Sequence, residues 1–224
     1  NNHVKLIKYK QLGSTYAWNS NINTSVSWEN SDMYKGLNGS YFLTNTTYDY
    51  LQNTEWSNKI ENWTWSAVNT YTYTSSGPDY NSLATSQIYL HEMNRTGKSS
   101  TVGEWTNPTA KIGLMYASDY ALSLGSSALA LTGSSNASTL KTGWMHQSNN
   151  DTAKSSYEWT LSRHGFYANK LGSGGYCAWI LNSGGSMDDY YVYSSYGVRP
   201  VFYLISNQTI LDGTGTLEDP IMLN

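Results

Sequence analysis

The stretch from Trp159 to Leu204 constrains the fold more than any other part of the chain. It contains two apolar runs, Tyr176–Leu181 and Gly197–Leu204, and a Ser-Gly-Gly-Ser turn with a tyrosine-rich segment lies between them. Short apolar runs bounded by glycine and serine are typical of buried strands. Of the 40 residues from Trp159 to Val198, 21 are Tyr, Ser, Gly or Asn. Flat rings spaced by small, adaptable residues are the composition of a binding surface, so this stretch (residues 159–204) is the candidate ligand-display region.

The rest of the chain predicts short elements joined by long polar loops. Residues 3–9 alternate like an opening strand, and Ser31 begins a short helix that extends to Leu37. A second helical stretch covers residues 47–60, and Ser118 and Asp119 predict the start of a helix from Tyr120 to Leu124. Residues 75–110 and 125–156 read as loops. No repeat or linker interrupts the pattern, so we predict one α+β domain over residues 1–224, with short irregular antiparallel strands and few short helices.

The composition limits the classes of partner. Charged residues make up 13% of the chain and the net charge is -3, which disfavours nucleic acid and anionic membranes as partners. No segment approaches the ~20 apolar residues of a membrane span, so we expect residues 1–224 to make no contact with a membrane. The aromatic share of 14% predicts a core that relies on Trp and Tyr. The polar, uncharged composition favours an extracellular or cell-surface location, with an anchor or signal expected upstream.

No catalytic or metal-binding pattern is present in the sequence. The single cysteine, Cys177, excludes a disulfide within the chain and a zinc site built from several cysteines, and its apolar strand predicts a buried, inert thiol. None of the four histidines has metal-ligand spacing, and no nucleophile elbow or phosphate loop occurs. The adjacent acids Asp188 and Asp189 fit a solvated loop tip better than a calcium or sugar ligand. We therefore predict no catalytic residues, no metal and no cofactor, and the scattered acids disfavour a glycan hydrolase.

The residues of the display region divide into two groups: buried residues that support the fold, which we call the frame, and exposed residues that could contact a ligand, which we call the face. Arg199 lies in an apolar run, which predicts a buried guanidinium paired with a carboxylate or a carbonyl. Trp159 and Trp179 are expected in the core. The candidate ligand-binding residues fall in two loops that flank one hairpin and are expected to lie side by side. The first loop supplies Arg163, His164, Phe166, Tyr167 and Asn169, and the second supplies Met187, Asp188, Tyr190, Tyr191 and Tyr193.

An ordered series of motifs resembles a known but uncharacterised domain family of gut Firmicutes and related bacteria. The series comprises Lys111-Ile-Gly-Leu-Met-Tyr-Ala-Ser-Asp-Tyr, Trp159-Thr-Leu-Ser, Gly197-Val-Arg-Pro-Val-Phe-Tyr-Leu, Asp212-Gly-Thr-Gly-Thr and a final Pro-Ile. Tyr16-Ala-Trp-Asn and Leu37-Asn-Gly-Ser-Tyr also fit, so the resemblance covers nearly the whole chain. That family is similar to C-type-lectin-like folds, the formylglycine-generating-enzyme branch included. The resemblance implies the same fold here.

The resemblance also implies a function. Members commonly follow a pilin-like helix, a lipoprotein signal or another surface anchor, and the fold carries the variable proteins of diversity-generating retroelements. A non-catalytic, adhesin-like or receptor-like domain is therefore expected, with an unknown protein or glycan on another cell or phage as its ligand. The alternative is a structural subunit that self-associates in a pilus-like surface filament. The chain lacks the Glu-Pro-Asn, Gln-Pro-Asp and Trp-Asn-Asp motifs of calcium-dependent lectins and the paired cysteines of the enzymes. Neither calcium-bridged sugar binding nor that oxidation chemistry is implied.

Overall fold

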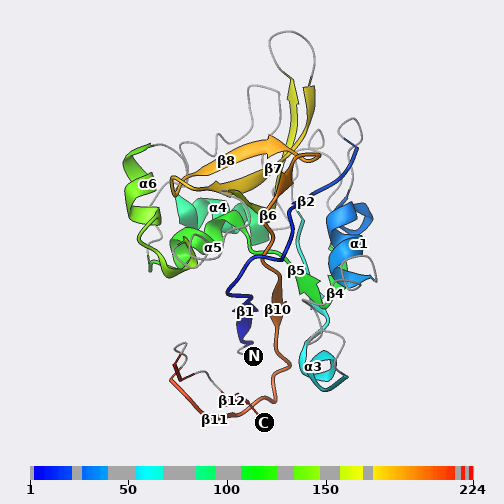
Figure 1. Ribbon diagram of the computed structural model, residues 1–224, viewed down its shortest axis with the longest axis vertical. Helices are drawn as coiled ribbons and strands as arrows, with labels where there is room; N and C mark the ends of the chain where they lie inside the picture. Colours follow the sequence, from blue (N-terminus) through cyan, green and yellow to red (C-terminus); the bar gives the residue numbers. More distant parts are fainter. Residues whose placement is uncertain are drawn as a thin grey trace.

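The computed structural model describes residues 3–21, 27–39, 54–67, 84–93, 107–125, 134–146, 157–168, 174–214, 218–219 and 222–223. These residues form a mixed α/β structure of mostly short antiparallel strands and few helices, as the α+β class predicts (Figure 1). The strands are β1 (Lys5–Ile7), β2 (Tyr16–Ala17), β3 (Trp63–Thr64), β4 (Thr109–Ala110), β5 (Ile112–Gly113), β6 (Tyr157–Ala168), β7 (Gly174–Asn182), β8 (Met187–Tyr191), β9 (Ser195–Tyr196), β10 (Val201–Tyr203), β11 (Ile210–Asp212) and β12 (Met222–Leu223). The helices are η1 (Trp28–Asn30), α1 (Asp32–Asn38), α3 (Thr54–Lys59), α4 (Thr85–Met93), α5 (Ala117–Leu122) and α6 (Ser134–Leu140).

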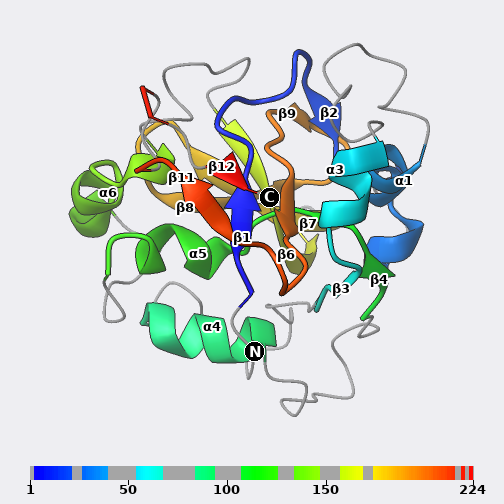
Figure 2. The ribbon, with the colours of Figure 1, turned by 90° about the horizontal axis from the view of Figure 1, so that it is seen from below.

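The strands pair into several small antiparallel sheets. One has the order β6-β7-β8 and another the order β1-β10-β5, while β2 pairs with β9, β3 with β4 and β11 with β12. Helix α5 packs against β6 and β7, and α4 packs in turn against α5. Figure 2 shows the two helices side by side when the molecule is seen from below. The β6-β7-β8 sheet therefore has one side covered by helices.

The strands of the β6-β7-β8 sheet are longer than the sequence predicts. The run Tyr176–Leu181 forms the middle of β7, as expected. The first predicted loop is wrong in its position, because β6 continues without interruption as far as Ala168. Pairing with β7 continues through irregularities around Arg163, so the Gly-rich and polar composition there marks a twisted hairpin and not a loop. The turn from β7 to β8 needs Gly185, whose φ is 90°.

Buried tryptophans tie distant segments together. Trp18, Trp28, Trp65 and Trp159 are at most 1% exposed, which agrees with the predicted aromatic core. The indole N–H of Trp159 donates to the carbonyl of Tyr16 at 2.8 Å, and that of Trp65 donates to the carbonyl of Ala110 at 3.0 Å. Trp159 and Trp65 thus each remove apolar area from water and also satisfy a backbone carbonyl.

Two predicted helices form, one of them displaced. Helix α1 begins after Ser31, as predicted, and the Ser31 hydroxyl accepts the Tyr34 backbone N–H at 3.0 Å. Helix α5 begins at Ala117, three residues before the predicted start, because the Asp119 carboxylate accepts the Tyr116 backbone N–H at 2.8 Å from inside the first turn. Of the predicted stretch 47–60, the described part contains α3, and residues 47–53 lie outside the described residues.

Two helices occur where loops were predicted. Helix α4 lies within residues 75–110 and α6 lies within residues 125–156. In α4 the apolar residues Ile88, Tyr89 and Leu90 are consecutive, so they make no stripe at helical spacing. Only Ile88 among them is buried, at 0% exposure, so tertiary packing and not local pattern places this helix.

Candidate ligand-binding site

Three tyrosines gather on one side of the β6-β7-β8 sheet. The rings of Tyr157 and Tyr196 are 5.1 Å apart, and the ring of Tyr190 lies 5.4 Å from that of Tyr196. Tyr196 also packs on buried Trp159 at 5.0 Å, so these rings rest on the core. We call Tyr157, Tyr190 and Tyr196 the tyrosine cluster. Its outermost member, Tyr190, is 41% exposed.

The hydroxyl group of Tyr196 stays protonated. Burial, together with the neighbouring Tyr190 and Tyr157, raises the pKa of Tyr196 to about 12. A neutral phenol both donates and accepts hydrogen bonds. The cluster therefore offers an apolar ring surface with polar tips, which suits a ligand that is itself amphipathic.

Two further tyrosines follow Tyr190 along the chain. Tyr191 and Tyr193 are stacked, with ring centroids 5.7 Å apart and an interplanar angle of 18°. Tyr193 is 49% exposed, while Tyr191 is half-buried. Cys177, Asp189, Tyr190 and Tyr191 line a pocket of ≈ 280 Å³ beside them. Burial raises the pKa of the Cys177 thiol, and Asp189 raises it further, so the thiol stays protonated, in agreement with the predicted inert cysteine.

The second predicted segment is a strand, and it presents only alternate residues outward. Asp188 and Tyr190 are exposed, as a face requires. Met187 is wrong as a face residue: it is 3% exposed and lies in the core. The physical reason is the pleat, because neighbouring residues of β8 point to opposite sides of the sheet: Met187 points into the packed side, and Asp188 points to the other.

The first predicted segment lies across β7 from the second. Arg163 is paired with Ala178, and Ala178 is paired in turn with Tyr190. The two segments are therefore not direct neighbours; they flank β7 in one row of the sheet. The backbone of Arg163, His164, Phe166 and Tyr167 belongs to β6, but their side chains and the whole of Asn169 lie outside the described residues.

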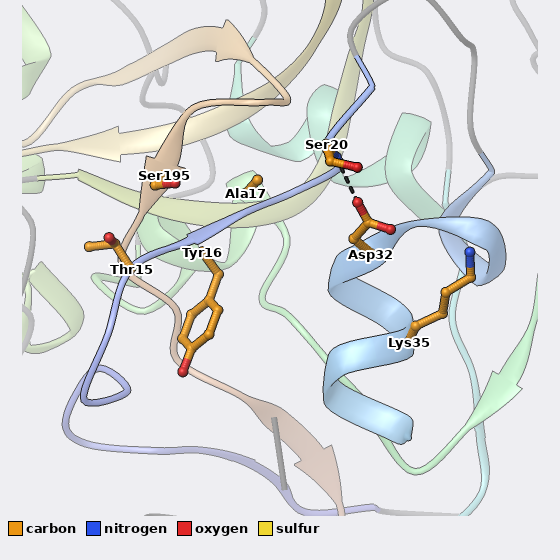
Figure 3. Close-up of a pocket in the computed structure, with 7 residues that line it drawn as sticks. All are labelled: Thr15, Tyr16, Ala17, Ser20, Asp32, Lys35 and Ser195. Atoms are coloured by element: carbon orange, nitrogen blue, oxygen red, sulfur yellow. Dashed lines mark hydrogen bonds between the residues drawn. The ribbon is translucent and has the colours of Figure 1, made fainter. Parts of the chain in front are cut away.

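A larger pocket adjoins the tyrosine cluster. It has a volume of ≈ 520 Å³, and its described lining residues are Thr15, Tyr16, Ala17, Ser20, Asp32, Lys35 and Ser195. Figure 3 shows the β2 and β9 residues on one side and the two charged residues of α1 on the other. Tyr16 stands directly opposite Tyr196 in the β2-β9 pair, so the pocket and the cluster share this strand pair.

The sequence missed several residues of this surface. Tyr157 lies just before the display region and Tyr196 lies well inside it, and their separation along the chain hides their contact. Tyr16 is distant from both in sequence, and Asp32 was predicted only as part of the helix that begins at Ser31. Alternation within Tyr190–Tyr196 would have indicated which of its rings share a side, but no local signal points to Tyr16.

The prediction for Arg199 is confirmed. Its guanidinium is 1% exposed, and its Nε donates to Glu158 Oε2 at 2.8 Å. The Nη2 atom donates to the Met145 carbonyl at 2.7 Å and to the Tyr120 hydroxyl at 3.3 Å. Burial alone would lower the pKa of Arg199, but the Glu158 carboxylate outweighs burial and raises it. These groups form part of the frame below the site.

A second buried carboxylate, Glu92, belongs to another core network. It is 1% exposed and accepts hydrogen bonds from the hydroxyls of Ser118 and Ser162, the latter at 2.5 Å. Burial raises the pKa of Glu92 to about 7, although both hydroxyls lower it in part. Glu92 and Glu158 are thus each held by core partners, and neither lines the pockets described above.

Within the described ranges, no group of three or more His, Cys, Asp and Glu side chains is arranged to hold a metal ion. None of the helices in this part of the chain is both long enough and apolar enough to cross a membrane. Comparison of the chain with protein-family models, curated proteins and solved structures gives no match.

Proposed function

We propose that this chain is a non-catalytic ligand-binding domain of a bacterial cell surface, with a C-type-lectin-like fold. Its ligand is a protein or a glycan, held by the tyrosine cluster and by the exposed residues of β8 and the turn after it. The observation that carries the proposal is the pair of exposed rings, Tyr190 and Tyr193, at 41% and 49% exposure. Exposed aromatic rings with fixed neighbours are typical of binding hot spots.

The strands that carry these rings lower the cost of binding. Tyr190 is held by β8 pairing and by the Tyr196 ring, and Tyr193 is held by stacking on Tyr191. A side chain that is ordered before binding loses less entropy when a ligand arrives. Asp188, exposed on the same strand, adds a hydrogen-bond acceptor at the rim.

Replacing Tyr190 and Tyr193 together by serine tests the proposal. We expect the double variant to lose binding to its partner on a glycan and surface-protein array by at least about tenfold, because hot-spot rings each contribute about 2 kcal/mol or more. The melting temperature should change little, since both rings are largely outside the core. Tyr89→Ser on α4 is the matched control, because Tyr89 is 40% exposed and lies on another element. Unchanged binding, or a large loss of stability, would contradict the proposal.

The same variant separates binding from filament assembly. A filament subunit would self-associate as its concentration rises, and the Tyr190→Ser, Tyr193→Ser variant would weaken that association in analytical ultracentrifugation. A ligand-binding domain loses its heterologous ligand and keeps its own association state. Diversification of residues 159–198 by a retroelement belongs to the same proposal; a reverse-transcriptase gene with a near-copy of this coding segment nearby would support it.

A further inference from the structure

We propose that the pocket between β2 and α1 binds a neutral saccharide unit, an inference that rests on the proposed function. The described lining combines one carboxylate, one ammonium group, three aliphatic hydroxyl groups and one phenol ring. These belong to Asp32, Lys35, Thr15, Ser20, Ser195 and Tyr16 (Figure 3). A volume of ≈ 520 Å³ lies within the range of about 300–1,000 Å³ that is usual for small-ligand sites.

The Asp32 carboxylate is fixed and ionised. Its Oδ2 accepts the Ser20 backbone N–H at 2.7 Å, and the Ser20 hydroxyl and N–H lower the pKa of this carboxyl group. One oxygen is thus held by the protein, and a carboxylate has about four acceptor positions in total. Acceptor positions therefore remain for hydroxyl groups of a ligand.

Asp32 and Lys35 do not neutralise each other by direct pairing. They are three residues apart on α1, a spacing at which opposite charges often pair. Among the residues that the structure describes, the ion pairs are His3–Glu61, Lys5–Asp119 and Arg199–Glu158, and neither Asp32 nor Lys35 takes part. The pocket thus offers an ionic acceptor and an ionic donor on one side.

A neutral sugar ring matches this set of groups. Its neighbouring hydroxyls can donate to a carboxylate and accept from an ammonium group, and charge-assisted hydrogen bonds are the stronger kind. Its C–H face can pack on the Tyr16 ring across the pocket. The two described charges cancel, so the lining gives no net attraction for an anionic or a cationic ligand.

The position of the pocket extends the tyrosine cluster. Tyr16 and Tyr196 are opposite each other across the β2-β9 pair, and Ser195 lines the pocket from β9 itself. A glycan with one unit in the pocket can continue over β9 to Tyr196 and Tyr190. The pocket would then recognise a sugar unit, and the cluster would add contact area to the rest of the chain.

Titration with simple compounds tests the pocket directly. We expect methyl hexosides and N-acetylhexosamine to bind the wild-type protein in ligand-observed NMR at concentrations up to about 50 mM, because single sugars bind weakly. Asp32→Asn should weaken binding about tenfold, since the amide keeps the Ser20 contact but loses the charged acceptor. Tyr16→Phe should retain binding and Tyr16→Leu should lose it. Asp212→Asn, at the exposed end of β11 and outside the pocket lining, is the control and should change nothing.

Each other outcome overturns the pocket proposal. Binding of glucuronic acid or of a free amino acid in place of neutral sugars would assign another ligand class. Absence of binding by any of these compounds, or binding that Asp32→Asn leaves unchanged, would show that this pocket holds no sugar. These failures leave the proposed function standing if the Tyr190 and Tyr193 variant still loses its array partner. If Asp32→Asn leaves sugar binding unchanged and the Tyr190 and Tyr193 variant keeps its array partner, both the pocket proposal and the proposed function are rejected.

Discussion

Replacing Arg199 by methionine is expected to lower the free energy of unfolding by about 3–5 kcal/mol. The guanidinium is fully enclosed and joins three elements of the core: Glu158 on β6, Tyr120 on α5 and the carbonyl of Met145. Methionine fills much of the same volume but leaves the Glu158 carboxylate buried with only the Tyr120 hydroxyl, at 2.5 Å, among the groups described here. A buried charge without its counter-ion accounts for most of the loss.

Urea unfolding at pH 7 measures this loss, and a double variant locates its origin. Arg199→Met combined with Glu158→Leu removes both charges, so we expect it to be more stable than Arg199→Met alone. Lys10→Met is the control, since Lys10 is exposed and its replacement should change the free energy of unfolding by less than about 0.5 kcal/mol. If Arg199→Met costs no more than Lys10→Met, the network is not part of the frame.

The sequence indicates the frame of the display region because the frame follows local rules. Arg199 is a charge inside an apolar run, Trp159 and Trp179 stand in strand patterns, and all three are buried. Ser31 caps α1 through a hydrogen bond within three residues, which a local motif can predict. The resemblance to a lectin-like family adds an expected fold, and that expectation remains a proposal.

The surface is harder to predict because it depends on register and on distant contacts. A shift of one residue reverses which side a strand residue faces. Met187 was assigned to the face because its segment was predicted to be a loop, and that prediction took no account of the alternation along a strand. The tyrosine cluster joins β6, β8 and β9, and the adjoining pocket adds β2 and α1. No spacing in the sequence predicts that these five elements lie next to one another. Helix α4 was not predicted for a related reason, since its single buried apolar residue, Ile88, makes no helical pattern in the sequence.

Stability should fall as the pH rises through the titration of Glu92. Its pKa is about 7 in the folded protein and near 4.5 when the side chain is free in water. Between these values the folded chain keeps a proton that the unfolded chain has released, so the unfolding free energy decreases with rising pH. The favourable contribution is complete below about pH 4.5 and is lost above about pH 7, and it amounts to about 3 kcal/mol. Asp119 strengthens the effect, because its charge also raises the pKa of Glu92.

Glu92→Gln isolates this contribution from those of the other acids. The amide is neutral at every pH, and its oxygen can accept from one of the two serine hydroxyls while its NH2 group donates to the other. The C=O and O–H of a protonated carboxyl group do the same, so the amide copies the protonated form of Glu92. Urea unfolding should give the two proteins similar stability at pH 5, and the variant should be more stable by about 2–3 kcal/mol at pH 8. Glu218→Gln makes the same change at an exposed position and should follow the wild type at both pH values. Parallel pH curves for wild type and Glu92→Gln would show that Glu92 does not carry a raised pKa, because a titrating group must separate the curves within its own pH window.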